Sequence, residues 1–118
     1  MLKGAYYFVD EDGRRLVKDF INSLTKKEQA KVYAYITELK DQGNNLRRPM
    51  ADYLRNGIYE LRPRDNRIFY FFYLRDRAVL VHAIKKHVNR IPAHDLKLCV
   101  NRKMKVEAGG AGIERIEL

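Results

Sequence analysis

Hydrophobic residues between positions 58 and 87 fall into three segments that are separated by short charged turns. The segments read Ile-Tyr-Glu-Leu-Arg, then Arg-Ile-Phe-Tyr-Phe-Phe-Tyr-Leu, then Ala-Val-Leu-Val-His-Ala-Ile-Lys-Lys-His. Aromatic and β-branched residues favour strands, and short polar turns join consecutive strands into hairpins. The pattern therefore predicts an antiparallel meander of three strands, around which the rest of the chain is organised.

The alternation of side chains predicts how this meander is covered, because successive residues of a strand point to opposite faces of a sheet. In the first segment, Tyr59 and Leu61 share one face, whereas Glu60 and Arg62 share the other. The middle segment is apolar on both faces, with Ile68, Tyr70, Phe72 and Leu74 on one side and Phe69, Phe71 and Tyr73 on the other. Such a strand belongs in the centre of a sheet that is covered on both faces, or covered on one face and used for binding on the other.

The period of the hydrophobic residues changes before the meander and predicts a pair of helices. After a strand at residues 5–9, apolar residues recur at helical spacing over residues 14–24 and indicate a short amphipathic helix. Thr25 and Glu28 form a capping box that opens a second helix, and Gly43 ends it. We expect these two helices to pack as a hairpin against the sheet.

The remaining segments complete one α+β domain. Pro92 suits the first turn of a last helix, whose apolar face is expected to comprise Ala93, Leu96, Cys99 or Val100, and Met104. Residues 44–57 are expected to form a long connection, and the glycine-rich residues 106–118 a flexible C-terminal tail in which 113–118 could pair as a short edge strand. The predicted architecture is a single domain over residues 1–105, with a small, mainly antiparallel sheet, an N-terminal helix hairpin on one face and a C-terminal helix.

Composition narrows the class of protein and of partner. The 118 residues suffice for one domain, and a net charge of +9 favours a polyanionic partner or an acidic protein. A basic surface without such a partner is the alternative. The single cysteine cannot form an internal disulfide, no zinc-type spacing is present, and no apolar run approaches the roughly 18 residues of a membrane helix. We therefore expect a cytoplasmic protein without metal or cofactor.

The topology of a meander brings basic residues from separate segments to one end of the sheet. The end of the first strand, the start of the second and the end of the third lie together, so a cationic site is expected from Arg62, Arg67, Lys85, Lys86 and His87. Other basic residues of the neighbouring turns and connections are candidate RNA contacts, namely Arg47, Arg48, Arg64 and Arg90. Ordinary ion-paired residues at a sheet edge would give the same pattern.

These segments resemble the HigB branch of the RelE/ParE toxin superfamily, of the phage-derived-protein type. The resemblance covers roughly residues 5–105. It rests on Asp19-Phe20-Ile21 in the helix hairpin, on Gly57-Ile58-Tyr59-Glu60-Leu61-Arg62, on the Arg67-Ile-Phe-Tyr-Phe-Phe and Val81-His82-Ala83-Ile84-Lys85-Lys86 segments, and on the proline-started helix at Pro92. The spacing between the Tyr-Glu-Leu-Arg and Arg-Ile-Phe-Tyr segments, followed by the double lysine, is its most specific part.

The resemblance implies a type II toxin that cleaves mRNA on the translating ribosome and is neutralised by a cognate antitoxin. The toxin would be a monomer within a toxin–antitoxin hetero-oligomer. The strand-borne arginines at positions 62 and 67, with the basic end of the last meander strand, would then form the site of a metal-independent endoribonuclease.

The residue types suit that chemistry, in which the 2′-hydroxyl attacks the scissile phosphate. Arginine stays protonated and its forked guanidinium matches a phosphate, so Arg62 and Arg67 are the expected charge stabilisers. Lysines near other cations have lowered pKa values, so Lys85 or Lys86 could exchange protons. Histidine 87 could act as acid or base, or be an unremarkable exposed residue. Glu60 is a possible base, or merely the partner of an arginine.

Other chemistry-bearing residues have structural explanations. Within its apolar strand, His82 is expected to be a hydrogen-bonded core residue, His94 to be structural, and Cys99 to be a packed core thiol. Phe69, Phe71 and Tyr73 are expected in the core, although an aromatic ring at the rim could stack on a base.

Two further functions are compatible with the sequence. The same superfamily contains ParE-type members that poison DNA gyrase through protein contacts, in which case the basic strand ends would be incidental. A basic module that binds nucleic acid or an acidic partner without chemistry is the third possibility.

Overall fold

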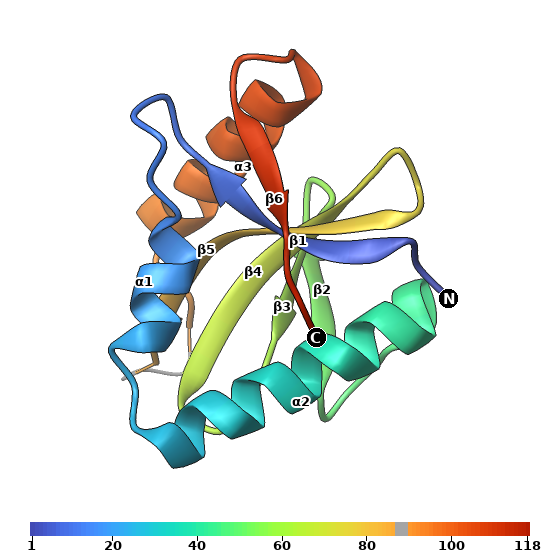
Figure 1. Cartoon of the computed structure of the whole chain (residues 1–118), viewed down its shortest axis with the longest axis vertical. Helices are drawn as coiled ribbons and strands as arrows, with labels where there is room; N and C mark the ends of the chain where they lie inside the picture. Colours follow the sequence, from blue (N-terminus) through green and yellow to red (C-terminus); the bar gives the residue numbers. More distant parts are fainter. Residues whose placement is uncertain (87–89) are drawn as a thin grey trace.

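The computed structural model describes residues 1–86 and 90–118, and Figure 1 shows the arrangement of the elements. The order along the chain is β1 (Gly4–Val9), α1 (Leu16–Asn22), α2 (Lys26–Gln42), a 3-10 turn η1 (Gly43–Asn45), β2 (Ala51–Arg55), β3 (Ile58–Leu61), β4 (Asn66–Tyr73), β5 (Arg77–Lys85), α3 (Ala93–Glu107) and β6 (Gly112–Arg115). This is the α+β class that the sequence predicts.

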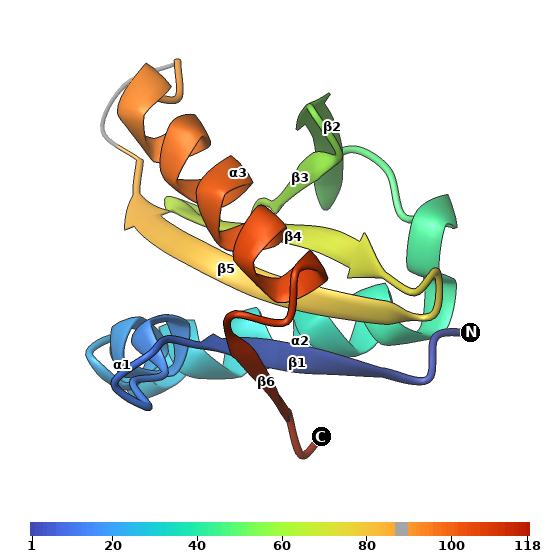
Figure 2. The same ribbon diagram turned by 90° about the horizontal axis from the view of Figure 1, so that it is seen from above.

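The strands form one mixed sheet in the order β2-β3-β4-β5-β1-β6. Strand β1 pairs in parallel with β5, and the other neighbours within the described residues pair antiparallel, so β3, β4 and β5 form the predicted meander. Helices α1 and α2 cover one face of the sheet and α3 covers the other, as the view along the sheet in Figure 2 shows. The predicted helix hairpin and C-terminal helix are therefore confirmed.

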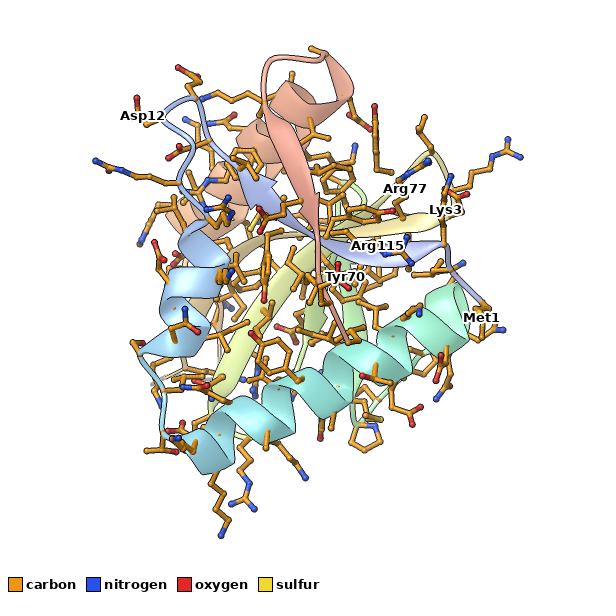
Figure 3. All side chains as sticks on the ribbon, in the orientation of Figure 1. Met1, Lys3, Asp12, Tyr70, Arg77 and Arg115 are labelled. Carbon is orange, nitrogen blue, oxygen red and sulfur yellow. The ribbon has the colours of Figure 1, made fainter. Side chains whose placement is uncertain are left out.

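The two faces of β4 fill two separate cores. Ile68 and Tyr70 face the helix hairpin, and Tyr70 lies in the interior between the sheet and α2 (Figure 3). Phe69 and Phe71 pack on the other face with Cys99 of α3. The central position predicted for this doubly apolar strand is confirmed. Leu74 departs from the prediction because it lies in the turn after β4, where it is exposed.

An extra residue in β5 changes which side chains face each core. Phe69 pairs with His82, whereas the next residue, Tyr70, pairs with Leu80, so Val81 is the additional residue of a β-bulge. A bulge shifts the alternation of the strand beyond it. Beyond Val81, the His82 ring stacks on Phe69 on the α3 face, at 5.7 Å between ring centroids. The bulge therefore decides which of the two lysines that follow lies on the α3 face.

The connection predicted between α2 and the meander contains a strand that the prediction missed. Strand β2 pairs antiparallel with β3, and Arg55 and Ile58 flank a two-residue turn. Its residues, Asn56 and Gly57, both have positive φ angles, of 54° and 79°. An Asn-Gly pair is the strongest short hairpin signal because both residues tolerate this backbone region. The signal was present in the sequence, and the expectation of a long connection was wrong for residues 51–55.

The C-terminal part of the chain adds to the fold in two ways. Residues 106–118 were expected to form a flexible tail outside the domain, in which 113–118 could pair as an edge strand. Instead α3 continues to Glu107, β6 pairs with β1, and Ile116 is buried against the helix-hairpin core. On α3, Cys99 is buried as expected, but Met104 is 59 % exposed and Asp95 is buried in the first turn. Met104 and Ala93, which is also exposed, were thus wrongly assigned to the apolar face.

Replacing Gly57 with alanine should destabilise the protein by about 1–2 kcal/mol, because an L-residue is strained at positive φ. The added Cβ would also lie 3.0 Å from Cε of Lys103. Urea unfolding of the wild type and Gly57→Ala measures the difference. Gly112→Ala is the matched control, because its Cβ would meet Val9 at an ordinary 3.7 Å. Equal stability of both variants would contradict the assigned turn.

Candidate active site: a cationic cleft

A cleft of about 750 Å³ opens where β2 and β3, the end of β5 and the start of α3 meet. Its charged lining residues are the cations Arg48, Arg55, Arg62, Lys86 and Arg90 and the carboxylates Asp52 and Glu60. Five positive groups thus face two negative ones, which favours an anionic ligand. The cleft lies on the α3 side of the meander end, where the strand topology predicted a cationic site.

Glu60 and Arg62 form a partly buried ion pair in the wall of the cleft. They are two residues apart on one strand and therefore share a face. Nη1 of Arg62 donates to Oε2 of Glu60 at 2.5 Å, and Glu60 is only 3 % exposed. The other carboxylate oxygen, Oε1, is buried without a hydrogen-bond partner among the described residues. A buried acceptor without a partner is costly, so this oxygen is an unsatisfied acceptor at the wall of the cleft.

Arg67 lies behind this wall and is oriented by the turn between β3 and β4. It is 7 % exposed, and its Nη1 donates to the carbonyl oxygens of Arg64 at 2.6 Å and Asn66 at 2.8 Å. Burial lowers its pKa, and the nearby charge of Arg62 adds to this effect. The guanidinium nevertheless stays protonated, because arginine does not lose its proton in proteins. Its buried Nε has no partner among the described residues.

Lys86 belongs to the same cluster. Desolvation lowers its pKa first, and the positive charges of Arg67 and Arg62 lower it further. Its backbone N–H donates to the Asp65 carbonyl at 2.7 Å, which holds the end of β5 against the turn after β3. The structure therefore brings together three of the predicted residues, Arg62, Arg67 and Lys86.

Lys85 does not join them. Consecutive residues of a strand point to opposite faces, and Lys85 points to the helix-hairpin face. There its Nζ forms a 2.6 Å ion pair with Oε2 of Glu28 in α2. The prediction placed both lysines in one cluster, and for Lys85 it was wrong. His87, the fifth predicted member, lies outside the described residues.

The four predicted RNA contacts divide into two pairs. Arg48 and Arg90 line the cleft, and Arg48 pairs with Asp52 at 2.9 Å. Arg47 instead turns its guanidinium to the carbonyl oxygens of Asn44 and Leu46. The exposed Arg64 sits in the β3–β4 turn with a φ of 58° and is not part of the cleft lining.

The sequence prediction did not include Arg55, which is a further cation of the cleft. It stands on β2, directly before the Asn56–Gly57 turn. Recognising that turn as a hairpin would have placed Arg55 beside β3 and close to the predicted cluster.

The histidine and cysteine assignments can be compared with their contacts. Nε2 of His82 lies 2.7 Å from Oδ1 of Asp95, so His82 is the hydrogen-bonded residue that was expected. Burial lowers its pKa despite the opposing effect of Asp95, so the neutral ring donates to the carboxylate. His94 is exposed on the first turn of α3. Burial raises the pKa of the Cys99 thiol to about 12, as expected for a packed core residue.

The cleft therefore presents guanidinium groups held by carboxylates, which suits an anion, and the buried carboxylate of Glu60 lies in its wall. In residues 1–86 and 90–118, no group of three or more His, Cys, Asp or Glu residues is placed to hold a metal ion. In the same residues, none of the helices has the length and apolar character required to span a bilayer.

Residues 19–104 match the family model of the phage-derived Gp49-like proteins (DUF891). This family is toxin-like and related to the RelE/ParE toxins. The matched region contains every cationic lining residue of the cleft, together with Glu60 and Arg67. Among curated proteins, none matches the chain.

Acidification should destabilise the wild type more than a His82→Gln variant. The pKa of His82 is lower in the folded protein than the value of about 6.5 for a free side chain. Its stabilising effect is fully present above about pH 6.5 and is lost as the pH falls below that value, because the unfolded chain then binds the proton more readily. Urea midpoints of both proteins at pH 7.5 and 5.5 test this. A gain of wild-type stability over the variant at pH 5.5 would contradict the neutral assignment.

Proposed function

We propose that this chain, which belongs to the phage-derived Gp49-like family, is a HigB-type toxin of a type II toxin–antitoxin system that cleaves mRNA on the translating ribosome. The observation that carries the proposal is the cluster of Arg62, Arg67 and Lys86 beside the unpartnered oxygen of Glu60. The toxin-like character of the family supports the same class of function.

The reaction we propose is attack of the 2′-hydroxyl on the adjacent phosphate, with rupture of the bond between phosphorus and the 5′-oxygen. Arg62 and Arg67 stabilise the charge that accumulates on the phosphate oxygens, because fixed guanidinium groups need little reorganisation. Oε1 of Glu60 accepts the 2′-hydroxyl proton. Lys86, with its lowered pKa, donates a proton to the departing 5′-oxygen.

Asp52 is less suited than Glu60 to act as the base. Its Oδ2 accepts from Arg48 and its Oδ1 from the backbone N–H of Tyr53, so both oxygens are occupied. Arg48 and Arg90 then contact RNA phosphates along the cleft, while His87 stays a candidate for either proton-transfer step. Lys85 supports the site from the other face of the sheet.

The partners follow from the same proposal. A cognate antitoxin neutralises the toxin, which we expect to be a monomer within the resulting hetero-oligomer. The ribosome presents the mRNA, the reaction takes place in the cytoplasm, and no metal or cofactor takes part.

Arg67→Ala should reduce cleavage about 100-fold, because removing one preorganised donor to a developing oxyanion has a cost of that order. Inducible expression of the wild type and the variant, with mRNA 5′ ends mapped within minutes, measures this effect. Arg115→Ala is the control, because it removes the same charge from β6, the edge strand at the end of the sheet away from β2 and β3. It should arrest growth like the wild type.

The possible outcomes separate the three classes of function. New mRNA ends within codons that disappear with Arg67→Ala support the nuclease. Growth arrest with intact mRNA and DNA damage would replace it with a gyrase poison of the ParE type. Tolerance of the wild-type protein, together with salt-dependent RNA binding, would indicate a binding module without chemistry.

Glu60→Gln should lower the turnover number by about 10²–10⁴-fold, the range for loss of a general base. Glutamine keeps an oxygen for Arg62 but cannot take up the proton, so the Michaelis constant should change little. Steady-state cleavage in a purified translation reaction, with circular dichroism to verify folding, measures both constants. Asp52→Asn is the matched control, and an equal loss in both variants would contradict the assignment of the base.

A further inference from the structure

Glu28 connects the start of α2 to the ends of two strands of the sheet. Its Oε1 accepts from the backbone N–H of Thr25 at 3.3 Å, which completes the capping box of α2. Its Oε2 accepts from Nζ of Lys85 at 2.6 Å and from Nδ2 of Asn66 at 3.3 Å. These contacts lower the pKa of Glu28 to about 2, with Lys85 as the largest cause, so the carboxylate is charged at neutral pH.

The two residues held by Oε2 are the chain neighbours of the cationic cluster. Asn66 directly precedes Arg67, Lys85 directly precedes Lys86, and Asn66 and Lys85 are paired across β4 and β5. Because neighbouring strand residues point to opposite faces, Glu28 holds these strand ends from the helix-hairpin face while Arg67 and Lys86 lie on the α3 face.

The cluster needs such support because its members repel one another. Desolvation is the largest cause of the lowered pKa values of Arg67 and Lys86, and positive charge adds to it, from Arg62 on Arg67 and from both arginines on Lys86. On the α3 face, Glu60 compensates Arg62, and the carbonyl oxygens of the β3–β4 turn hold Arg67. Within the described residues, no ion pair is formed by Lys86.

We propose that Glu28 is a positioning residue, which fixes Lys86 at the cleft and Arg67 behind its wall by holding the ends of β4 and β5 from the opposite face. The expected effect of Glu28 on the cleavage rate rests on the proposed endoribonuclease function. Its expected effect on the position of Lys86 does not. The two carboxylate oxygens of Glu28 make different contacts: Oε1 caps α2 and Oε2 holds the strand ends. Helix capping and strand positioning can therefore be separated by mutation.

Three variants make this separation. Glu28→Gln removes the charge that attracts Lys85, while glutamine still serves in a capping box. Thr25→Ala removes the Oγ1 that accepts from the Glu28 backbone N–H at 3.1 Å, but it leaves the pair with Lys85. Glu114→Gln breaks the Arg15–Glu114 pair, an interaction between two elements at 2.7 Å with similar exposure, away from the cleft.

Cleavage kinetics are the first measurement. Glu28→Gln should lower the turnover number about tenfold and change the Michaelis constant less than about twofold, because a displacement of about 1 Å can cost up to about 100-fold. Thr25→Ala and Glu114→Gln should keep the wild-type turnover number even where their melting temperatures fall.

The titration of Lys86, followed by NMR in lysine-labelled protein without RNA, is the second measurement. In Glu28→Gln the lysine should become more hydrated and more distant from Arg67, so its lowered pKa should rise toward the usual value. The two control variants should titrate like the wild type. This readout does not depend on activity, so it tests the inference even if the wild-type protein proves not to cleave RNA.

Two results would overturn the inference. The first is a Glu28→Gln variant whose turnover number and Lys86 titration both match those of Glu114→Gln. The second is a Thr25→Ala variant that loses as much turnover as Glu28→Gln, because Glu28 would then act through the helix cap alone. A wild type without nuclease activity, but with the expected shift of Lys86, would retain the positioning role and refute the proposed function.

Discussion

Desolvation and mutual repulsion of three cations at one end of the sheet, Arg62, Arg67 and Lys86, are the constraint that the surrounding contacts offset. Like charges at one end of a sheet destabilise the fold unless nearby groups compensate them. Here the compensation comes from the buried carboxylate of Glu60 and from turn carbonyls, while Glu28 pairs with Lys85 on the other face of the sheet. A polyanion in the cleft would relieve the same repulsion directly. The groups that hold the free protein together thus also keep these cations clustered at one end of the sheet.

The β-bulge at Val81 determines which lysine takes part. Without the extra residue, the alternation of β5 would place Lys85 on the α3 face and direct Lys86 toward α2. The bulge exchanges these roles, so that Lys86 enters the cationic cleft while Lys85 pairs with Glu28. The extra residue Val81 therefore allows Lys85 to pair with Glu28 of α2 on one face and places Lys86 beside Arg62 and Arg67 on the other.

The sequence carries most of the fold because its local signals agree with one another. The doubly apolar β4, the capping box of Thr25 and Glu28 and the proline before α3 all occur where they were expected. The end of the sheet that bears the site could also be predicted, because strand direction alone determines it. The assignment of Lys85 failed because a bulge leaves no mark in the pattern of hydrophobic residues. Strand β2 was missed for a different reason, since the Asn56-Gly57 pair is a local hairpin signal and the prediction placed it in a connection instead.

The contacts that prepare the site are the least accessible to sequence reasoning. Glu28 was recognised as the second half of a capping box, a role that involves only one of its oxygens. The other oxygen reaches residues 38 and 57 positions away in the sequence, and no local pattern predicts such a contact. The start of α2 lies against the ends of β4 and β5. The carboxylate of Glu28 can therefore cap the helix and also contact Asn66 and Lys85, whose chain neighbours form the cationic cluster on the other face of the sheet. In such a small domain, a helix-capping residue can therefore also contact the strand residues next to a candidate site that it does not touch.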